Sequence, residues 1–270
     1  MNGALTLSDR EFKKFATLVY DRTGINLNLG KKSLLQGRVN KVLRKRGINS
    51  YKEYYSLITA DKSETELIGF INLISTNVTH FFREEKHFEY LRDPWATEMA
   101  GEGDTVEVWS AASSSGEEPY SLAIELAEIL KGRPYTILGS DISTRVLNTA
   151  ERGVYTMEKL KMIPKHRLHK YFQKGAGKSE GYARVKKELR DRVSFRVVNL
   201  IKDFPFQKKF DLIVCRNVMI YFDTPVKNGI ISRLQRHLKP GGTLFIGHSE
   251  TLNGLEHSLQ YIAPAIYRKQ

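Results

Sequence analysis

Apolar residues in the first ninety positions recur at the three-to-four-residue spacing of helices. Ser8 stands before the first apolar run as an N-cap, and Gly47 ends the second run. The pattern predicts four helices, over about residues 5–22, 31–46, 51–58 and 67–73. We therefore expect residues 1–90 to form a small helical N-terminal domain and a linker.

After Pro94 the pattern changes to short apolar or alternating runs separated by helices. The predicted strands cover residues 105–109, 135–140, 193–198, 210–215, 243–246 and 261–267, the last as a single strand. The predicted helices cover residues 119–130, a segment after Ser143, and residues 225–238. Strands that alternate with helices pair mainly in parallel. We therefore expect residues 91–270 to form an α/β domain with a doubly wound, mostly parallel sheet.

One segment interrupts this alternation. Residues 174–181 form a glycine-rich polar turn, and short alternating runs flank it at 171–173 and 182–185. Two short strands joined by such a turn are typical of a hairpin. We expect a small antiparallel β-subdomain, inserted at about residues 171–192.

The composition is that of a folded protein. Of the 270 residues, 41% are hydrophobic and 27% are charged, which excludes a disordered chain. The single cysteine, Cys215, excludes a disulfide framework and a cysteine-rich zinc site, and it fits a reducing, cytoplasmic location. No apolar run of about 18 residues is present, and the N-terminus lacks the order of a signal peptide. We therefore expect no membrane insertion.

Basic residues are concentrated near the N-terminus. Lysine and arginine total 43 against 30 acidic residues, which gives a net charge of +13. Residues 1–52 contain twelve of the basic residues and three of the acidic ones. Arg38, Lys41 and Lys45 fall together beside the apolar stripe of the second helix. This excess predicts an acidic partner (nucleic acid, anionic membrane or acidic protein), although a solvated surface explains it equally well.

The first strand, a turn of small residues at 110–116 and the following helix make a candidate nucleotide site. The turn has one glycine and no Gly-Lys-Ser/Thr ending, so it is neither a dinucleotide fingerprint nor a P-loop. Glu117 and Glu118 begin the helix and would repel phosphates. Asp141, at the end of the second strand, is placed to accept hydrogen bonds from ribose hydroxyls.

A cationic nucleoside without phosphate, S-adenosyl-L-methionine, fits these three acids. Alternatively, the two glutamates serve only the helix dipole, and Asp141 is a helix N-cap. The Lys-Pro-Gly-Gly turn at residues 239–242 favours the cofactor, because doubly wound methyltransferases often carry such a turn.

Three segments resemble motifs of one family and lie in that family's order. They are Thr76–Glu84 (TNVTHFFRE), Trp109–Ala123 (WSAASSSGEEPYSLA) and Cys215–Asp223 (CRNVMIYFD). The family is that of the CheR-type chemotaxis receptor glutamate O-methyltransferases. The resemblance covers essentially the whole chain, and its departures, at 113–115 and 139–140, exchange one small residue for another. It implies a helical N-terminal domain, an α/β domain that binds S-adenosyl-L-methionine, and an inserted β-subdomain.

The resemblance also implies the site residues. Those that match the family's cofactor contacts are Asn77, Thr79, Arg83, Glu117, Asp141, Asn199, Leu200, Arg216 and Asn217. Arg83 and Tyr221 match the two residues nearest the methyl group and are the expected catalytic pair, although Tyr221 could instead be an aromatic core residue. The implied reaction moves the methyl group to a glutamate carboxylate and leaves S-adenosyl-L-homocysteine.

This reaction needs no general base, because a glutamate side chain with a pKa of about 4.3 is ionised at neutral pH. We expect Arg83 and Tyr221 to position groups, since a strong ion pair with the carboxylate would favour the ground state over the transition state. Cys215 is expected to be a core residue, and no metal is expected. Four histidines are expected to be structural: His80, His87, His237 and His248.

Two substrates explain the basic first domain. In the first hypothesis, Arg38, Lys41 and Lys45 bind a helical cytoplasmic region of a methyl-accepting chemoreceptor that bears glutamates. In the alternative, the same face binds RNA or DNA and the protein is a nucleic-acid methyltransferase. The sequence lacks the Asp/Asn-Pro-Pro-Tyr/Phe motif and an aromatic stacking platform, so we expect the receptor and no nucleic acid. A non-catalytic adaptor is a third possibility, which the complete set of site residues opposes.

Overall fold

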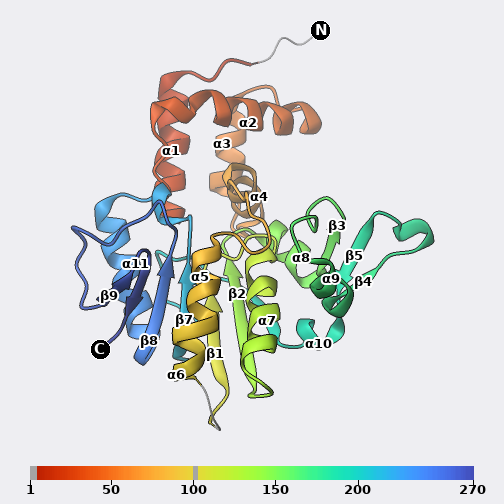
Figure 1. Cartoon of the computed structure of the whole chain (residues 1–270). Coiled ribbons are helices and arrows are strands. Elements are labelled where there is room, and N and C mark those ends of the chain that lie inside the picture. The colour runs from red at the N-terminus through yellow and green to blue at the C-terminus, as the bar shows by residue number, and fades with distance from the viewer. Residues whose placement is uncertain (1–4, 100–102) are drawn as a thin grey trace. The chain divides into compact units, whose positions relative to one another are not determined.

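The computed structural model describes residues 5–99 and 103–270, and the chain divides into two compact units (Figure 1). The helical unit ends at Thr76 and also contains Tyr221–Val226; the sheet unit comprises Asn77–Ile220 and Lys227–Gln270. The division falls after Thr76 and not at residue 90, because the helices over 85–98 pack on the sheet. Phe88, Leu91 and Trp95 share one apolar core with β1.

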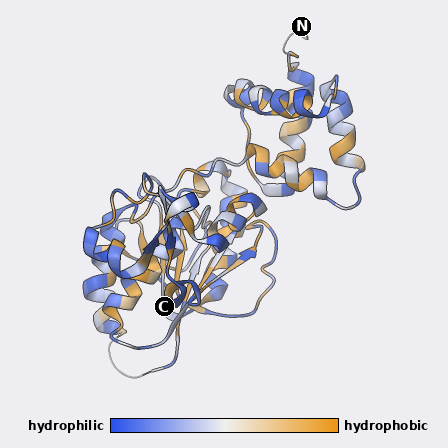
Figure 2. Cartoon of the chain, turned by 90° about the vertical axis from the view of Figure 1, so that its right-hand side faces the viewer, coloured by the Kyte–Doolittle hydropathy of each residue, from blue (hydrophilic) through white to orange (hydrophobic). Residues whose placement is uncertain are grey.

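The helical unit consists of short amphipathic helices. They are α1 (Asp9–Thr23), a 3₁₀ turn η1 (Leu29–Lys31), α2 (Lys32–Arg46), α3 (Tyr51–Ala60) and α4 (Thr65–Ile74). Ser8 caps α1 in a capping box with Glu11, and Gly47 ends α2 with a left-handed φ of 69°, so both signals are confirmed. The Phe15 and Phe70 rings pack 5.3 Å apart in the core of this unit. Figure 2 shows apolar and polar segments alternating within these helices.

The sheet unit contains the predicted doubly wound sheet, with strand order β6-β2-β1-β7-β8-β10-β9. The strands are β1 (Val106–Ser110), β2 (Tyr135–Asp141), β6 (Val193–Val197), β7 (Phe210–Cys215), β8 (Leu238–Ile246), β9 (Gln260–Ala263) and β10 (Ile266–Arg268). The first five strands in this order pair in parallel, and β10 is antiparallel to its two neighbours. The run at 261–267, predicted as one strand, is two strands, because Ala265 adopts a left-handed φ of 64° and turns the chain back.

Helices cover this sheet, and α5 and α7 lie over the face turned toward the viewer in Figure 1. The helices and helical turns are α5 (Glu85–Tyr90), the π-helical η2 (Leu91–Trp95), α6 (Ala96–Glu98), α7 (Glu117–Ile129), α8 (Thr144–Arg152), α9 (Lys165–Tyr171), η3 (Gly177–Ser179), α10 (Lys187–Arg190), η4 (Met219–Tyr221) and α11 (Thr224–His237). Val106, Val108 and Trp109 of β1 are fully buried, as expected of a central strand.

The inserted β-subdomain is a three-stranded antiparallel sheet of order β3-β5-β4. Its strands are β3 (Val154–Thr156), β4 (Phe172–Lys174) and β5 (Tyr182–Val185). The predicted hairpin corresponds to β4 and β5. The expected range of 171–192 omits β3, because three residues are too few to show a strand periodicity.

Among the described residues, no helix combines the length and the apolar character that crossing a bilayer requires.

Candidate functional site

The site begins at the carboxyl end of β1, where the strand order of the sheet reverses. β2 and β6 lie on one side of β1, and β7 and β8 lie on the other. Open α/β sheets bind their ligands outside such a switch point. The backbone N–H of Ser113 donates to Ser140 O (2.8 Å) and fixes the turn beside β2. Gly116 has a φ of 94°, and a Cβ there would lie 2.7 Å from the Tyr155 hydroxyl, so this position requires glycine.

Asp141 ends β2 and joins it to the turn. Its Oδ2 accepts from the Ser114 N–H (3.0 Å), and its Oδ1 accepts from the Ser143 N–H (2.9 Å). The side chain is buried, and burial raises the pKa of its carboxyl, while the two backbone hydrogen bonds oppose that rise. Ser143, and not Asp141, occupies the N-cap position of α8, so the alternative role of Asp141 as a helix cap is wrong.

Glu117 begins α7 and is completely buried. One of its carboxylate oxygens is ion-paired with the Lys159 ammonium, whose side chain is 45% exposed. The other oxygen accepts from the Ser115 hydroxyl (2.6 Å). A buried carboxylate whose counterion is partly exposed is able to exchange that counterion for a cationic ligand, because the displaced ammonium can be solvated.

Glu118, the next residue, has a different environment. Its carboxylate accepts from the Ser110 hydroxyl (2.6 Å) and from Nε of Arg216 (2.9 Å), and both partners are buried. Burial raises the pKa of Glu118, and the Arg216 guanidinium opposes that rise. Glu118 therefore holds the protein's own arginine, which leaves Glu117 as the acid available to a ligand.

The segment 77–84 lies against this turn. The Ser114 hydroxyl donates to Asn77 O (3.2 Å), and Nη1 of Arg216 donates to Arg83 O (2.8 Å). Because Ser114 also donates to Asp141, this one residue connects the end of β2 with the segment that carries Asn77 and Arg83.

Two polar atoms beside the turn lack partners. Nδ2 of Asn77 and Oγ of Ser113 are buried and have no hydrogen bond to any of the described residues. Such atoms are expected where a ligand supplies the missing partner. Thr79 and Arg83 are half-buried on the same segment, and Arg83 donates to Val78 O (3.3 Å). These donors and acceptors, together with Glu117 and Asp141, fit the hydroxyl, amino and carboxylate groups of S-adenosylmethionine.

Asn199 and Leu200 follow β6 and lie next to the end of β2. The backbone N–H of Val198 donates to Asp141 O (3.1 Å), which connects the two chain segments. Oδ1 of Asn199 accepts from the Ile201 N–H (3.3 Å), and Leu200 is buried. The structure therefore brings both residues to the same edge of the sheet as Asp141.

Asn217 follows β7 and Arg216 on the loop toward η4. It has a left-handed φ of 56°, and its Nδ2 donates to Oε1 of Glu84 (3.1 Å). The structure thus gathers the expected cofactor residues of the sheet unit at the carboxyl edge of the sheet.

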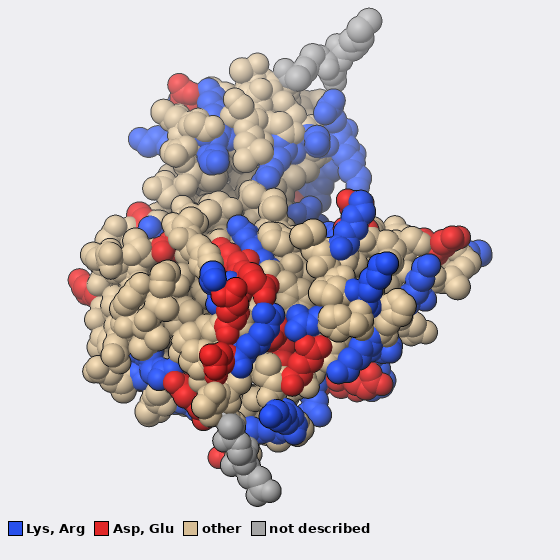
Figure 3. Space-filling model, viewed as in Figure 1, with Lys and Arg blue, Asp and Glu red and all other residues tan. Residues whose placement is uncertain are grey.

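The four other expected site residues belong to the helical unit. The Tyr221 carbonyl accepts from the Asn26 N–H (2.9 Å). Arg38 donates to carbonyls at the end of α4, those of Leu73 (3.2 Å), Ile74 (2.5 Å) and Ser75 (3.3 Å). Lys41 and Lys45 are exposed on α2. Figure 3 shows mostly basic side chains among the charged groups on the visible face of this unit.

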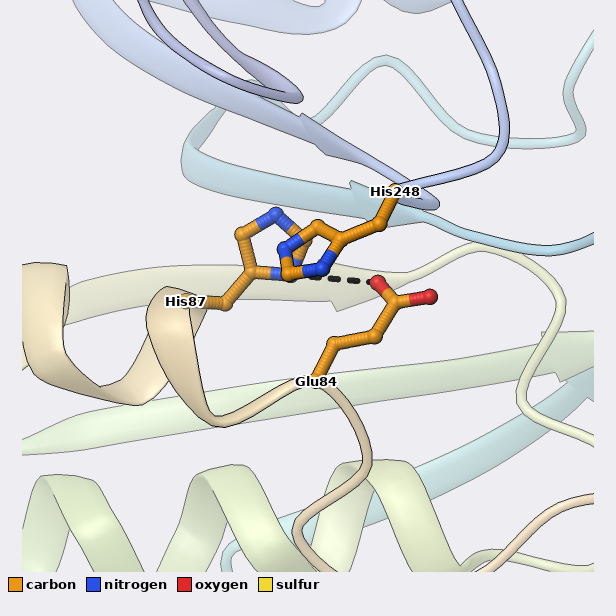
Figure 4. A group of neighbouring side chains, drawn as sticks. All are labelled: Glu84, His87 and His248. Carbon is orange, nitrogen blue, oxygen red and sulfur yellow. Dashed lines mark ion pairs between the residues drawn. The ribbon is translucent and has the colours of Figure 1, made fainter.

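A cluster beside the site has the composition of a metal centre. Ligand atoms of Glu84, His87 and His248 lie within 4.8 Å of one another (Figure 4). However, Nη1 of Arg216 lies 3.0 Å from His87 Nδ1 and 3.8 Å from the Glu84 carboxylate. Burial and this guanidinium lower the pKa of His87 to about 3. A metal ion would have to share these ligands with a buried cation, so we interpret His87 as a hydrogen-bond acceptor for Arg216 and Glu84 as its longer-range ion-pair partner.

Three residues that shape this site, Lys159, Glu84 and Glu250, could not be predicted from the sequence. Lys159 lies 42 positions from Glu117 in an irregular segment, and Glu84 and Glu250 contact loop backbone or side chains across the fold. Lysines and glutamates are common on surfaces, so their type alone carries no signal.

Comparisons with known proteins identify the family. The family models described as CheR methyltransferase, all-alpha domain, and CheR methyltransferase, SAM binding domain, match residues 10–75 and 77–267. The chain is 40% identical over 270 residues to the chemotaxis protein methyltransferase of Salmonella typhimurium, covering 99% of this chain and 92% of that protein. It is 38% identical over 278 residues to the chemotaxis protein methyltransferase of Borreliella burgdorferi, covering 99% and 97%.

Among solved structures, the glycopeptide N-methyltransferase MtfA complexed with S-adenosylmethionine aligns with a TM-score of 0.36 and 16% identity, over 69% of this chain and 59% of that chain. The predicted cofactor is confirmed by the family match, which covers the turn, the strand ends and the loop described above. Both matched models and the relatives at about 40% identity over nearly the whole length lead to one conclusion: the chain belongs to the CheR methyltransferase family and is an S-adenosylmethionine-dependent methyltransferase of chemotaxis.

Proposed function

We propose that this protein methylates glutamate side chains of methyl-accepting chemoreceptors and releases S-adenosylhomocysteine. The observation that carries the proposal is the pair of buried acids, Glu117 and Asp141, beside a turn that lacks the glycine pattern of a phosphate-binding loop. The relatives support the acceptor class, because they are named chemotaxis protein methyltransferases.

Different site residues would bind different groups of the cofactor. Asp141 suits the ribose hydroxyls, and Glu117 suits the cationic end once it gives up Lys159. The other expected contacts are Asn77, Thr79, Arg83, Asn199, Leu200, Arg216 and Asn217. When bound, S-adenosylmethionine supplies a methyl group on a positively charged sulfur.

The protein's own contribution is positioning. A glutamate acceptor with a pKa of about 4.3 is already ionised, so no residue has to remove a proton. Arg83 and Tyr221 are the residues we assign to orienting the acceptor and the cofactor. Holding reacting groups in the attack geometry supplies up to about 7–11 kcal/mol in favourable cases.

We assign docking of the receptor to α2 of the helical unit. Lys41 and Lys45 are exposed there, within a segment of twelve basic and three acidic residues. A helical receptor region with glutamates at helical spacing offers the complementary charge. A cytoplasmic location follows from this partner and agrees with a single buried cysteine.

The test is transfer of a labelled methyl group to receptor-containing membranes, followed by mild alkali. Carboxyl methyl esters hydrolyse and release volatile labelled methanol, whereas methylated bases do not. We expect alkali-labile label on the receptor with the wild-type protein. E117Q and D141N should weaken S-adenosylhomocysteine binding roughly tenfold or more. Alkali-stable label, or label in added RNA or DNA, contradicts the proposal.

Docking is tested by reversing charge on α2. K41E/K45E should reduce receptor methylation at low salt and leave S-adenosylhomocysteine affinity unchanged, because the substitutions are in the other unit. K52E, an exposed lysine on α3, is the matched control. Equal methylation by K41E/K45E and wild type at every salt concentration argues against electrostatic docking through α2.

A further inference from the structure

A carboxylate outside the expected site organises one of the site's loops. Glu250 lies on the turn after β8, and Oε2 of its carboxylate accepts from the N–H groups of Asn217 (2.9 Å) and Gly247 (2.6 Å). Its Oε1 accepts from the N–H groups of Met219 (2.8 Å) and Ile220 (3.3 Å). One side chain therefore satisfies four backbone donors, three of them on the loop between β7 and α11.

That loop has a conformation that needs outside support. Asn217 holds a left-handed φ of 56°, a conformation that most residues with a Cβ avoid and that asparagine adopts where local hydrogen bonds support it. Met219–Tyr221 forms the short helix η4, and the first N–H groups of a helix have no acceptor within it. A carboxylate at this end satisfies those donors and complements their partial positive charge.

The turn and the loop are also in close contact. A Cβ on Gly247 would lie 2.6 Å from Nδ2 of Asn217 and 3.0 Å from its backbone N, so this approach requires glycine. The Asn217 side chain is held from the other side by Glu84. Glu250 and Gly247 therefore act together to fix one conformation of residues 217–220.

We propose that Glu250 is a positioning residue for methyl transfer. It fixes the loop that presents Arg216 and Asn217 to the cofactor and that runs directly into Tyr221. This inference rests on the proposed function, in which those residues bind the cofactor and orient the acceptor. Glutamine cannot replace Glu250, because its amide has a single acceptor oxygen and turns two N–H donors toward backbone N–H groups.

The experiment compares E250Q with E256Q, an exposed glutamate six residues further along the chain. Three quantities are measured: amide hydrogen exchange of residues 217–220, S-adenosylhomocysteine affinity by calorimetry, and kcat for receptor methylation. In E250Q we expect exchange of 217–220 to accelerate at least tenfold. We expect kcat to fall roughly 10- to 100-fold, and E256Q to match wild type.

E250Q with wild-type exchange and wild-type kcat overturns the proposal. If E250Q does not fold, G247A is the second variant, because a Cβ there would lie 2.8 Å from Oε2 of Glu250 and 3.0 Å from the Asn217 backbone N and would push the carboxylate and the loop apart. Faster exchange confined to 217–220 supports the proposal, and unchanged exchange overturns it. If the wild-type protein does not methylate receptors, the proposed function is wrong. The role of Glu250 is then decided by the exchange of 217–220 and by S-adenosylhomocysteine affinity, which do not depend on the acceptor.

Discussion

Lys159 and Glu117 form an ion pair in which one side chain is partly exposed to solvent and the other is not. The lysine side chain is 45% exposed, whereas the glutamate side chain is fully buried. Removing the lysine leaves an uncompensated charge that water cannot reach, and removing the glutamate leaves an ammonium that can be rehydrated. The pair therefore predicts an asymmetric response to mutation.

K159M should destabilise the sheet unit by about 2–4 kcal/mol, and E117Q by less than about 1 kcal/mol. Urea denaturation of the two variants and wild type measures both values. K161M is the matched control, because Lys161 and its partner Glu158 are both mostly exposed. Saturating S-adenosylhomocysteine should restore part of the loss in K159M, since a bound ligand stabilises the folded state. Equal stability of K159M and K161M contradicts this interpretation.

Replacing Arg38 is expected to destabilise the helical unit, whereas the sequence suggested that this residue docks the receptor. Its guanidinium donates to three carbonyls at the carboxyl end of α4, and these carbonyls have no N–H donor within the helix. R38A should lower the stability of the helical unit by roughly 1–3 kcal/mol. K45A, an exposed residue on the same helix, should have little effect. Thermal unfolding of both variants is the measurement, and an unchanged R38A midpoint shows that the bonds to α4 contribute nothing.

Local signals in the sequence predicted local structure well. Ser8 was predicted as the N-cap of α1, to which the structure adds Glu11 as the second half of a capping box, and the end of β2 identified Asp141. Contacts between distant segments were not predictable. Glu250 meets Asn217 across 33 positions, and nothing in the composition of either loop marks the pairing.

The role of Arg38 illustrates the same limit. Helical spacing placed it correctly on one side of α2 with Lys41 and Lys45. Helical spacing could not show that the carboxyl end of α4 lies beside Arg38 and accepts its hydrogen bonds, because that contact depends on how the helices pack. The charge pattern therefore identified a basic helix. Only the tertiary structure distinguishes Arg38, which bonds to α4, from the exposed Lys41 and Lys45.

Replacing Tyr221 by phenylalanine is expected to lower turnover without changing the affinity for the cofactor. If its hydroxyl orients the acceptor, Y221F should lower kcat roughly 10- to 100-fold and leave S-adenosylhomocysteine affinity within about twofold. Calorimetry and labelled methyl transfer measure the two quantities. Y261F, which alters an exposed tyrosine of β9, should match wild type in both. Full turnover by Y221F removes the hydroxyl from the mechanism.

Protonation of His87 is expected to lower the free energy of unfolding at acidic pH. Its ring is buried, stacks on Phe245 at 4.5 Å, and faces Arg216, Glu84 and His248. Burial and the Arg216 guanidinium lower its pKa from 6.5 to about 3, so the unfolded chain binds a proton here that the folded chain does not. The stability that neutral His87 contributes is complete above pH 6.5 and is lost as the pH falls toward 3.

Between pH 7 and pH 5 this one group should remove up to about 2 kcal/mol of stability. Urea denaturation at pH 7, 6 and 5 measures the loss in wild type, in H87Q and in the control H166Q, whose histidine is exposed. The other titratable groups are present in all three proteins, so the difference between their pH dependences reports on the His87 site. H87Q should lose about 2 kcal/mol less than wild type over this range, while H166Q should follow wild type. Parallel curves for wild type and H87Q mean that His87 is already protonated in the fold, and Arg216 would then need a different acceptor.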